Sequence, residues 1–379
     1  MKKRVVVLGA AGSIGRQTID IIRSSMRSEH PLELAGFSIH RNMEVLARLR
    51  QEFPQAAAAC TGSAQDAGEA VFSGPDALEK LLENANADIV VNGIAGAAGL
   101  SASVLTVRHG IDLALANKES IVMGYHLLRK LADLHGSAIV PVDSEHAALF
   151  QLFNRIGTRD IAELTITASG GPFRTTPLEM LPLMTPEDAC RHPVWSMGRK
   201  ISIDSATMAN KGLELIEASR LFGLPQEKIK VLVHPQSIVH AMVRTTDGAL
   251  YAHMSEPDMR LPIQAALYWP RTLPCPFGTA NLAGKTLEFF EAEPERYPLL
   301  SLSRKAAEMG DAACICYNAA DEVAVSAFEK GKIRFTDIAR VVAESLEKDW
   351  NLPVRCFEDI FELDMKARRI AERAVEHCE

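Results

Sequence analysis

The sequence predicts an α/β protein with an N-terminal doubly wound parallel sheet, a central α+β region and a C-terminal helical region. An aliphatic run, Val5–Leu8, leads into a glycine turn and then a helical stretch, which is how such sheets begin. Further apolar runs follow up to residue 142, and beyond residue 299 the periodicity is helical only. A chain of 379 residues exceeds one ordinary core. We therefore expect domains at 1–143, 144–268 and 299–379, with a proline-rich linker at 269–298.

Composition limits the classes of partner. Hydrophobic residues make up 47% and charged residues 23% of the chain, as in soluble globular proteins. The net charge of −7 and the lack of a basic arm argue against nucleic acid, but a few placed cations suffice for a small phosphate. The seven cysteines are scattered, which predicts reduced thiols. No signal peptide or membrane span is apparent, so we expect a cytoplasmic protein without a membrane partner.

The first domain is predicted to contain five buried strands, since short apolar runs recur between helical stretches. These runs are Val5–Leu8, Glu33–Ile39, Asp88–Asn92, Asp112–Ala116 and Ala138–Val142. In an open parallel sheet, ligands bind beyond the carboxyl ends of the strands. The polar residues that follow several of these runs are therefore candidates for a site.

The turn GAAGSIG, residues 9–15, follows the first strand and predicts a dinucleotide site. Gly9 permits the tight turn, Gly12 lets the backbone approach a pyrophosphate, and Gly15 lets the helix pack on the strand. A purely structural glycine turn is the alternative.

The second strand ends in His40, Arg41 and Asn42, where folds that bind NAD usually have a carboxylate for the ribose hydroxyl. A cation there favours a 2′-phosphate, and hence NADPH. The alternative is that Arg41 is an ordinary surface residue.

Two acidic residues after the fifth strand are candidates for metal ligands. Asp143 and Glu145 are two positions apart in an extended turn, so their carboxylates can point into one cavity. Together with Glu214 they would form an all-oxygen set that suits Mg²⁺ or Mn²⁺. The alternative is helix capping, with Asp143 or Ser144 as the N-cap and Glu145 in the first turn.

The segment HPVWSMGRKISIDSATMANKGLELIE, residues 192–217, concentrates polar side chains. ISIDS alternates as a half-buried strand does, and Ser205 is a plausible N-cap for the helix that follows. On that helix Asn210, Lys211 and Glu214 project from one side, a combination suited to an anionic, metal-chelating ligand. A solvated amphipathic helix explains the same pattern equally well.

The stretch from Cys190 to Arg199 lacks periodicity and predicts a mobile loop whose Trp195 covers a bound ligand. A buried, anchoring tryptophan is the alternative.

Downstream, strands are expected at 163–168 and 228–233, and a hairpin within 239–254 that turns at Asp247-Gly248. A short helix is expected within 257–268. The C-terminal helices are predicted at 300–309, 314–329, 336–346 and 357–375.

With these clusters in view, the chain closely resembles the 1-deoxy-D-xylulose 5-phosphate reductoisomerase family over nearly its full length. The resemblance rests on GAAGSIG (9–15), LANKES (115–120), PVDSEH (141–146), ASGGPF (168–173), the segment from 192 to 218, HPQSIVHAMV (234–243), EPDMR (256–260) and NAADE (318–322). It implies a Rossmann-like NADPH-binding domain, a central catalytic, metal-binding and dimerisation domain, and a homodimer.

The resemblance also implies which residues bind the cofactor. The positions carried over, with the two lid residues last, are Ala11, Gly12, Ser13, Ile14, His40, Arg41, Asn42, Asn117, Glu119, Gly198, Trp195 and Met197. Two of them depart from the family pattern. Ala11 replaces a frequent hydroxyl residue and so removes one possible side-chain hydrogen bond to the cofactor, and His40 stands where glycine is common.

The implied metal ligands are Asp143, Glu145 and Glu214, with Mg²⁺ or Mn²⁺ as the ion and Co²⁺ as a further candidate. The implied substrate-binding positions are Lys118, Ser144, Glu145, Ser169, His192, Ser205, Asn210, Lys211 and Glu214, and those around the phosphate are Ser169, Ser205, Asn210 and Lys211. Lys118, Asp143, Glu145 and Glu214 are the implied catalytic residues.

The expected reaction is conversion of 1-deoxy-D-xylulose 5-phosphate into 2-C-methyl-D-erythritol 4-phosphate, a step of the non-mevalonate isoprenoid pathway, by a rearrangement followed by reduction with NADPH. Two other functions remain open. One is a metal-independent NADPH dehydrogenase of amino-acid biosynthesis, and the other is a non-catalytic nucleotide-sensing module.

Overall fold

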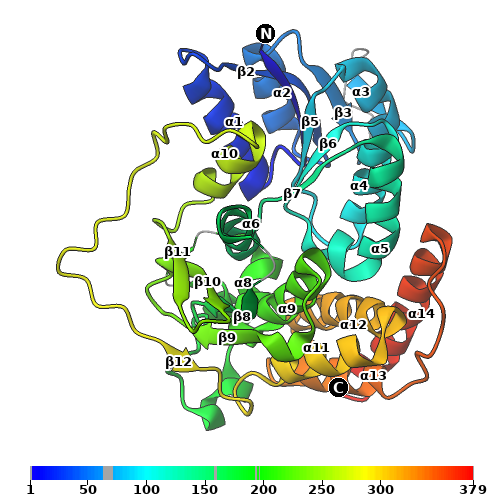
Figure 1. The fold of residues 1–379 in the computed structure, drawn as a ribbon. Coiled ribbons are helices and arrows are strands. Elements are labelled where there is room, and N and C mark those ends of the chain that lie inside the picture. Colours follow the sequence, from blue (N-terminus) through cyan, green and yellow to red (C-terminus); the bar gives the residue numbers. More distant parts are fainter. Residues whose placement is uncertain (1, 63–70, 158–159, 193, 196, 379) are drawn as a thin grey trace. The chain divides into compact units, whose positions relative to one another are not determined.

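A computed structural model describes residues 2–62, 71–157, 160–192, 194–195 and 197–378 (Figure 1). Contacts divide the chain into two compact units. The first unit contains residues up to 120, 128–147 and 258–278, and the second contains 121–127, 148–257 and 279–379. The domain boundaries expected from the sequence stay a prediction. In the described ranges, no helix is both long and apolar enough to cross a bilayer.

The first unit is built on a parallel sheet with the strand order β4-β3-β2-β1-β5-β6-β7. Its strands are β1 (Lys3–Leu8), β2 (Leu32–Ile39), β3 (Ala57–Cys60), β4 (Val71–Ser73), β5 (Ile89–Asn92), β6 (Asp112–Leu115) and β7 (Ile139–Pro141). The predicted parallel sheet is confirmed, and β3 and β4 are additional strands. β1 pairs with β2 on one side and β5 on the other, so the order reverses there. Such a reversal is where doubly wound sheets bind ligands.

Helices cover both faces of this sheet (Figure 1). They are α1 (Ser13–Ser25), α2 (Met43–Glu52), α3 (Ala77–Ala85), α4 (Ala98–Arg108) and α5 (Lys118–His135), of which only residues 121–127 belong to the second unit. Val6 and Leu8 of β1 share a core with α3 and α4. The intervening Val5 and Val7 are also fully buried. A strand buried on both faces explains the continuous aliphatic run.

The glycine turn lets α1 start directly against the end of β1. The Gly12 amide donates to the Gly9 carbonyl at 2.9 Å and closes the turn. A Cβ atom built on Gly15 would lie 2.4 Å from the Gly9 carbonyl oxygen, so only glycine permits this packing. The role predicted for Gly15 is confirmed.

One helix of the first unit comes from much later in the chain. This helix, α10 (Arg260–Tyr268), packs on α1. The Tyr268 hydroxyl donates to the His30 carbonyl at 2.8 Å, which ties the end of α10 to the turn before β2.

The second unit contains a mixed sheet with the order β11-β10-β8-β9-β12. Its strands are β8 (Ile161–Ala168), β9 (Ile229–Val233), β10 (Val239–Thr245), β11 (Leu250–Met254) and β12 (Phe290–Glu291). β10 and β11 form the predicted hairpin, and β8 and β9 are parallel. Leu164 and Ile166 of β8 pack with Leu215 and Ala218 of α9 (Ala209–Phe222), which fixes that helix over the sheet.

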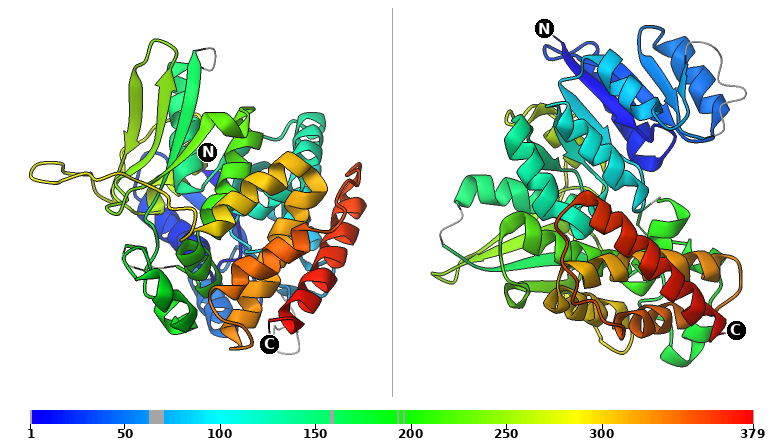
Figure 2. Two further views of the ribbon diagram at one scale, coloured as in Figure 1. Left: turned by 90° about the horizontal axis from the view of Figure 1, so that it is seen from below. Right: turned by 90° about the vertical axis from the view of Figure 1, so that its right-hand side faces the viewer.

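The C-terminal helices pack together and against α8 (Arg199–Thr207) and α9 within the same unit (Figure 2). They are α11 (Pro298–Met309), α12 (Asp311–Glu329), α13 (Asp337–Leu346) and α14 (Phe357–Glu376), close to the predicted spans. α12 is buried along most of its length. These helices therefore form the layer that supports α8 and α9.

Candidate functional site

The acidic pair of the first unit follows β7 at the carboxyl edge of the parallel sheet. One carboxylate oxygen of Asp143 and one of Glu145 lie within 4.8 Å of each other. The Lys118 ammonium, in the first turn of α5, lies 2.9 Å from Oδ2 of Asp143, and both side chains are largely buried. A cation beside two close carboxylates offsets part of their mutual repulsion. The structure thus brings Asp143, Glu145 and Lys118 together, as the strand ends predict.

Asp143 also caps a helix. Its Oδ1 accepts from the Glu145 amide at 3.2 Å, at the start of α6 (Ser144–Ile156). The Ser144 hydroxyl donates to Oε2 of Glu145 at 2.7 Å. The capping alternative is therefore confirmed for Asp143. The other oxygen of Asp143, Oδ2, contacts Lys118, and a Glu145 oxygen lies near the Asp143 carboxylate. Capping and ligation are compatible because a carboxylate has two oxygens.

His146 is a residue of this cluster to which the sequence alone gave no role. Its side chain is fully buried, and its Nδ1 lies 2.9 Å from Oδ1 of Asp143. His146 thus contacts Oδ1 of Asp143, while Lys118 contacts Oδ2 of the same carboxylate. The Asp143–His146 spacing of three residues at a helix start was the only available signal.

Asn117 and Glu119 hold the second glycine-rich turn, residues 93–99. The Asn117 amide donates to the carbonyls of Ile94 and Gly96, each at 2.9 Å, and to Glu119 at 2.7 Å. Glu119 accepts from the Gly96 amide at 2.9 Å. Both side chains are buried, so they shape the wall of the predicted nicotinamide site.

The predicted 2′-phosphate segment lies at the end of β2. Oδ1 of Asn42 caps α2 by accepting from the Val45 amide at 3.0 Å. Arg41 is exposed, and among the described residues its guanidinium has no hydrogen-bond partner. Nδ1 of His40 lies 3.1 Å from the Thr61 hydroxyl. The segment therefore presents one cation whose guanidinium remains available to an anion.

In the second unit, α9 brings three predicted side chains together. Nδ2 of Asn210 donates to Glu214 at 2.5 Å, and the Lys211 ammonium pairs with the other Glu214 oxygen. Lys211 and Glu214 are 4% and 1% exposed. Solvated amphipathic helices keep such charges in water, so that alternative is wrong.

The strand predicted for ISIDS is wrong, because residues 201–205 lie within α8. Ser205 is consequently inside a helix and is not the N-cap of α9, which starts after Met208 in the left-handed conformation with φ of 62°. The polar residues of α8 form an ion-pair network that reaches α12. A pattern of five alternating residues cannot reveal such a distant partner. Asp204 pairs with Lys200 at 2.6 Å, and Lys200 reaches Asp321 of α12 at 3.2 Å.

Ser169 and Ser205 come from neighbouring backbone segments. A Cβ atom built on Gly171 would lie 2.6 Å from the Ser205 carbonyl oxygen, so the glycine turn after β8 packs directly on α8. The Ser169 hydroxyl lies 2.8 Å from Nε2 of His192. The structure therefore places three of the predicted substrate positions on adjoining segments.

The hydrogen bonds of His192 define its tautomer. Nδ1 accepts from the Trp195 amide at 2.8 Å, so in the neutral ring Nε2 bears the proton and donates to the Ser169 hydroxyl. Burial lowers the pKa of His192 to about 4, which keeps the ring neutral. Oγ of Ser169 also accepts from the Gly171 amide at 3.1 Å. The proton of the Ser169 hydroxyl can then be donated to another acceptor, such as an anion.

Of the predicted lid, the structure describes Trp195, Met197 and Gly198. Residues 193 and 196 of the same segment lie outside the described residues. The Trp195 indole is half-buried, with its ring 6.4 Å from the His240 ring between centroids. His240 is buried, and its Nε2 lies 2.9 Å from the Ser255 hydroxyl. The sequence alone gave His240 no role, because no local motif marks it.

The fold and site of the first unit define the class of protein. A doubly wound parallel sheet with a glycine turn at its reversal and an arginine after β2 is typical of dinucleotide-dependent oxidoreductases.

Comparison with known proteins identifies the family. A 1-deoxy-D-xylulose 5-phosphate reductoisomerase model matches residues 5–124, and two models of that enzyme's C-terminal domain match 139–222 and 254–370. The chain belongs to the 1-deoxy-D-xylulose 5-phosphate reductoisomerase family.

Relatives of this family match the chain almost completely. The 1-deoxy-D-xylulose 5-phosphate reductoisomerase of Treponema denticola is 47% identical, covering 98% of this chain and 96% of the relative. That of Cupriavidus metallidurans is 44% identical, covering 98% of this chain and 97% of the relative.

Two solved structures also match almost the whole chain. The enzyme from Zymomonas mobilis in complex with NADPH has a TM-score of 0.88 and 38% identity, covering 99% of this chain and all of the other. A DOX-P reductoisomerase in complex with NADPH, fosmidomycin and magnesium has a TM-score of 0.89 and 36% identity, covering 99% of this chain and 98% of the other.

Proposed function

We propose that this chain converts 1-deoxy-D-xylulose 5-phosphate into 2-C-methyl-D-erythritol 4-phosphate, using NADPH and a divalent metal. The observation that carries the proposal is the half-buried Asp143–Glu145 pair beside the buried Lys118, at the carboxyl edge of the sheet that bears the glycine turn. The relatives that match the full chain bear the name of this enzyme. A related structure holds NADPH and magnesium together with fosmidomycin.

The donor set fits a hard divalent ion. Asp143 and Glu145 offer carboxylate oxygens only, at a separation within 4.8 Å that one cation can bridge. We propose Glu214 as the third ligand, since it is a buried carboxylate on the helix that also carries Asn210 and Lys211. An ion held by these carboxylates would supply Lewis-acid chemistry, polarising the substrate carbonyl and lowering the pKa of the adjacent hydroxyl.

Lys118 is the residue best suited to handle charge at the reacting carbons. Its ammonium is largely buried and lies beside Asp143. In such an environment a fixed cation stabilises a developing oxyanion strongly, and it can also move a proton. The carbon skeleton is proposed to rearrange by carbon–carbon cleavage and re-addition, followed by reduction of the aldehyde, with NADPH supplying the hydride.

The phosphate is proposed to bind to Ser169, Ser205, Asn210 and Lys211. The Ser169 hydroxyl and the buried Lys211 ammonium are donors of the kind that a phosphate dianion requires. His192 orients Ser169 through Nε2. Binding energy from this group, remote from the reacting carbons, is proposed to close the Trp195 loop and exclude water.

The cofactor is proposed to lie along the turn formed by Ala11, Gly12, Ser13 and Ile14, with its pyrophosphate at the start of α1. This helix has 13 residues, and no side chain caps its first amides. Those amides are therefore available to a phosphate. Arg41 is proposed to contact the 2′-phosphate.

The direct test follows NADPH absorbance with 1-deoxy-D-xylulose 5-phosphate, with and without Mg²⁺ or Mn²⁺. We expect oxidation of NADPH only with both substrate and metal present. Turnover that survives a chelator would favour the metal-independent dehydrogenase. NADPH binding without turnover of any sugar phosphate would favour the nucleotide-sensing module.

We also propose a homodimer in which two copies pair along β11. This strand lies at the edge of its sheet and exposes Leu250, Tyr251 and Met254 by 49%, 45% and 43%. An exposed apolar edge strand is a ready template for pairing with another chain. Light scattering on size-exclusion fractions should give twice the chain mass, and Tyr251→Lys should shift the protein toward monomer.

The proposed compartment is the cytoplasm, where a reducing environment keeps thiols free. All seven cysteines are free, including the exposed Cys356. Cell fractionation with an antibody against the chain would test this proposal.

A further inference from the structure

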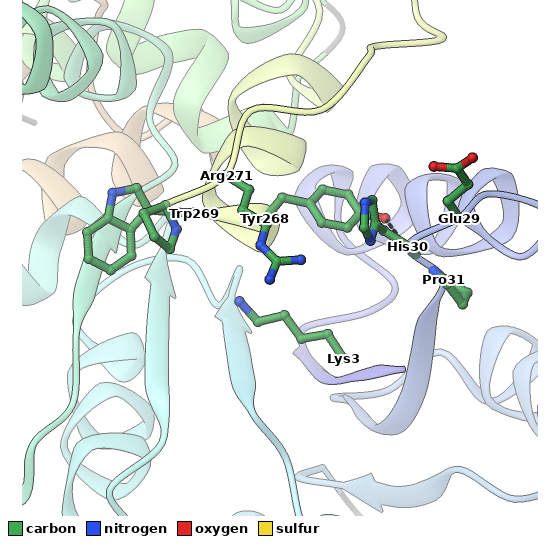
Figure 3. A pocket seen from close by; sticks show the side chains of 8 residues that line it. Lys3, Glu29, His30, Pro31, Tyr268, Trp269 and Arg271 are labelled. Atoms are coloured by element: carbon green, nitrogen blue, oxygen red, sulfur yellow. Dashed lines mark hydrogen bonds between the residues drawn. The ribbon is translucent and has the colours of Figure 1, made fainter. Parts of the chain in front are cut away.

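The first unit contains a cavity at the edge of the sheet opposite the glycine turn. Its volume is about 430 Å³, and it is formed by the first residue of β1, the turn before β2 and the segment after α10 (Figure 3). The glycine turn lies at the other end of the six-residue β1. At about 3.3 Å per residue, the cavity is roughly 20 Å from the proposed cofactor site.

Two cations point into this cavity. The Lys3 ammonium and the Arg271 guanidinium both line it, and in Figure 3 their charged ends converge. Among the described residues, neither side chain has a hydrogen-bond or ion-pair partner. Two converging cations repel each other unless an anion lies between them.

The surroundings of Lys3 strengthen this argument. Its side chain is half-buried, and burial lowers the pKa of its ammonium even though Asp112 and Asp88 act in the opposite direction. A bound anion would replace part of the lost hydration. The one carboxylate of the lining, that of Glu29, points away from both cations (Figure 3). Among the residues that line the cavity, the charges that point into it are therefore the two cations.

The remaining walls are flat and largely apolar. Tyr268, Trp269 and two prolines line the cavity, and Trp269 is 37% exposed. The bond from Tyr268 to the His30 carbonyl holds the two walls together. A volume of this size with a few charged groups among aromatic walls is typical of sites for small organic ligands.

We propose that this cavity binds a small organic phosphate, with the phosphoryl group between Lys3 and Arg271 and the organic part against Trp269. Arg271 offers a planar pair of donors that matches two phosphoryl oxygens, and Lys3 supplies a point charge. The site is separate from the substrate site, because it uses no residue assigned to the reaction.

Isothermal titration calorimetry with phenyl phosphate tests the proposal. Arg271→Met and Lys3→Met should each weaken binding about tenfold or more, because each loses a charge-assisted hydrogen bond. Arg27→Met and Lys2→Met are matched controls, since both residues are exposed and lie outside the cavity lining. Their affinities should equal that of the unaltered protein.

Titration with inorganic phosphate as a second ligand distinguishes the contribution of the phosphoryl contact from that of the apolar wall. Trp269→Ala should weaken phenyl phosphate but leave inorganic phosphate unchanged, while Arg271→Met should weaken both. Arg271 is exposed, so its variant tests the idea even if Lys3→Met folds poorly. Phenyl phosphate affinity that is the same in all variants, or no binding at all, would overturn the proposal.

Discussion

The Lys200 ammonium lies between two buried carboxylates, 2.6 Å from Oδ2 of Asp204 and 3.2 Å from Oδ2 of Asp321. This arrangement ties the first turns of α8 to α12. The proposed phosphate ligand Ser205 follows Asp204 directly, so the C-terminal helices position part of the proposed substrate site. Burial, and then the nearby Asp204 charge, raise the pKa of Asp321 well above its ordinary value.

This raised pKa should make stability depend on pH. The native Asp321 holds its proton above about pH 3.9, where the unfolded chain has lost it. The native state therefore binds more protons, and its contribution to stability falls as pH rises. Asp321→Asn should flatten this part of the profile, as measured by urea unfolding at pH 5 and pH 8. The exposed Glu308→Gln should not, and an equally steep Asp321→Asn profile would contradict the prediction.

His192 should titrate far below an ordinary histidine. Burial lowers its pKa to about 4, so in acid the unfolded chain takes up a proton first. Its contribution to stability should therefore be lost as pH falls from about 6.5 to about 4. Histidine ring resonances in an NMR titration, assigned with His192→Asn, should show this midpoint. A midpoint near 6.5 would contradict the prediction, because it would mean that burial does not lower the pKa of His192.

Glu214→Gln should remove a proposed metal ligand with little change in shape. We expect turnover to fall at least about 100-fold, equivalent to about 2.7 kcal/mol, and the half-saturating Mn²⁺ concentration to rise. NADPH oxidation across a Mn²⁺ titration measures both. Glu308→Gln is the surface control. Near-normal turnover in Glu214→Gln would remove this residue from the ligand set.

Arg41→Ala should weaken NADPH about tenfold or more, because a charge-assisted bond to the 2′-phosphate is lost. NADH lacks that phosphate, so its affinity should be unchanged. Fluorescence titration with each cofactor gives both values. Arg48→Ala, an exposed neighbour on α2, is the matched control. An equal loss for both cofactors would mean that Arg41 does not recognise the 2′-phosphate.

Trp195→Ala distinguishes a lid from an anchor. A lid residue acts when substrate is bound, so turnover should fall about tenfold or more while NADPH affinity and melting temperature stay unchanged. Trp195→Phe should retain much of the activity. A large drop in melting temperature would instead support the anchoring role.

The sequence predicted most regular elements because hydrophobic periodicity determined them. The buried aliphatic strands and the amphipathic C-terminal helices carry their own signal. The strand β3 was missed because its residues, AAAC, lack the β-branched side chains that mark strands. The sequence of α8 predicts a strand because the polar Ser202 and Asp204 alternate with apolar residues, although the helix buries both.

The candidate site was predictable where its residues follow strand ends or share a helix face. Asp143, Glu145 and the Asn210–Glu214 set were found in this way. His146, His240 and Asp321 were not, because their roles depend on partners that only the folded chain provides. Resemblance to a family supplied specific roles that periodicity alone cannot give.

The late position of α10 has a consequence for biosynthesis. Residues 258–278 complete the first unit, yet they are translated only after 110 consecutive residues of the second unit, 148–257. The first unit therefore cannot finish folding as soon as its own sheet leaves the ribosome. Until then the face of α1 that α10 covers stays open, and a nascent chain stalled before residue 260 would be a natural target for chaperones.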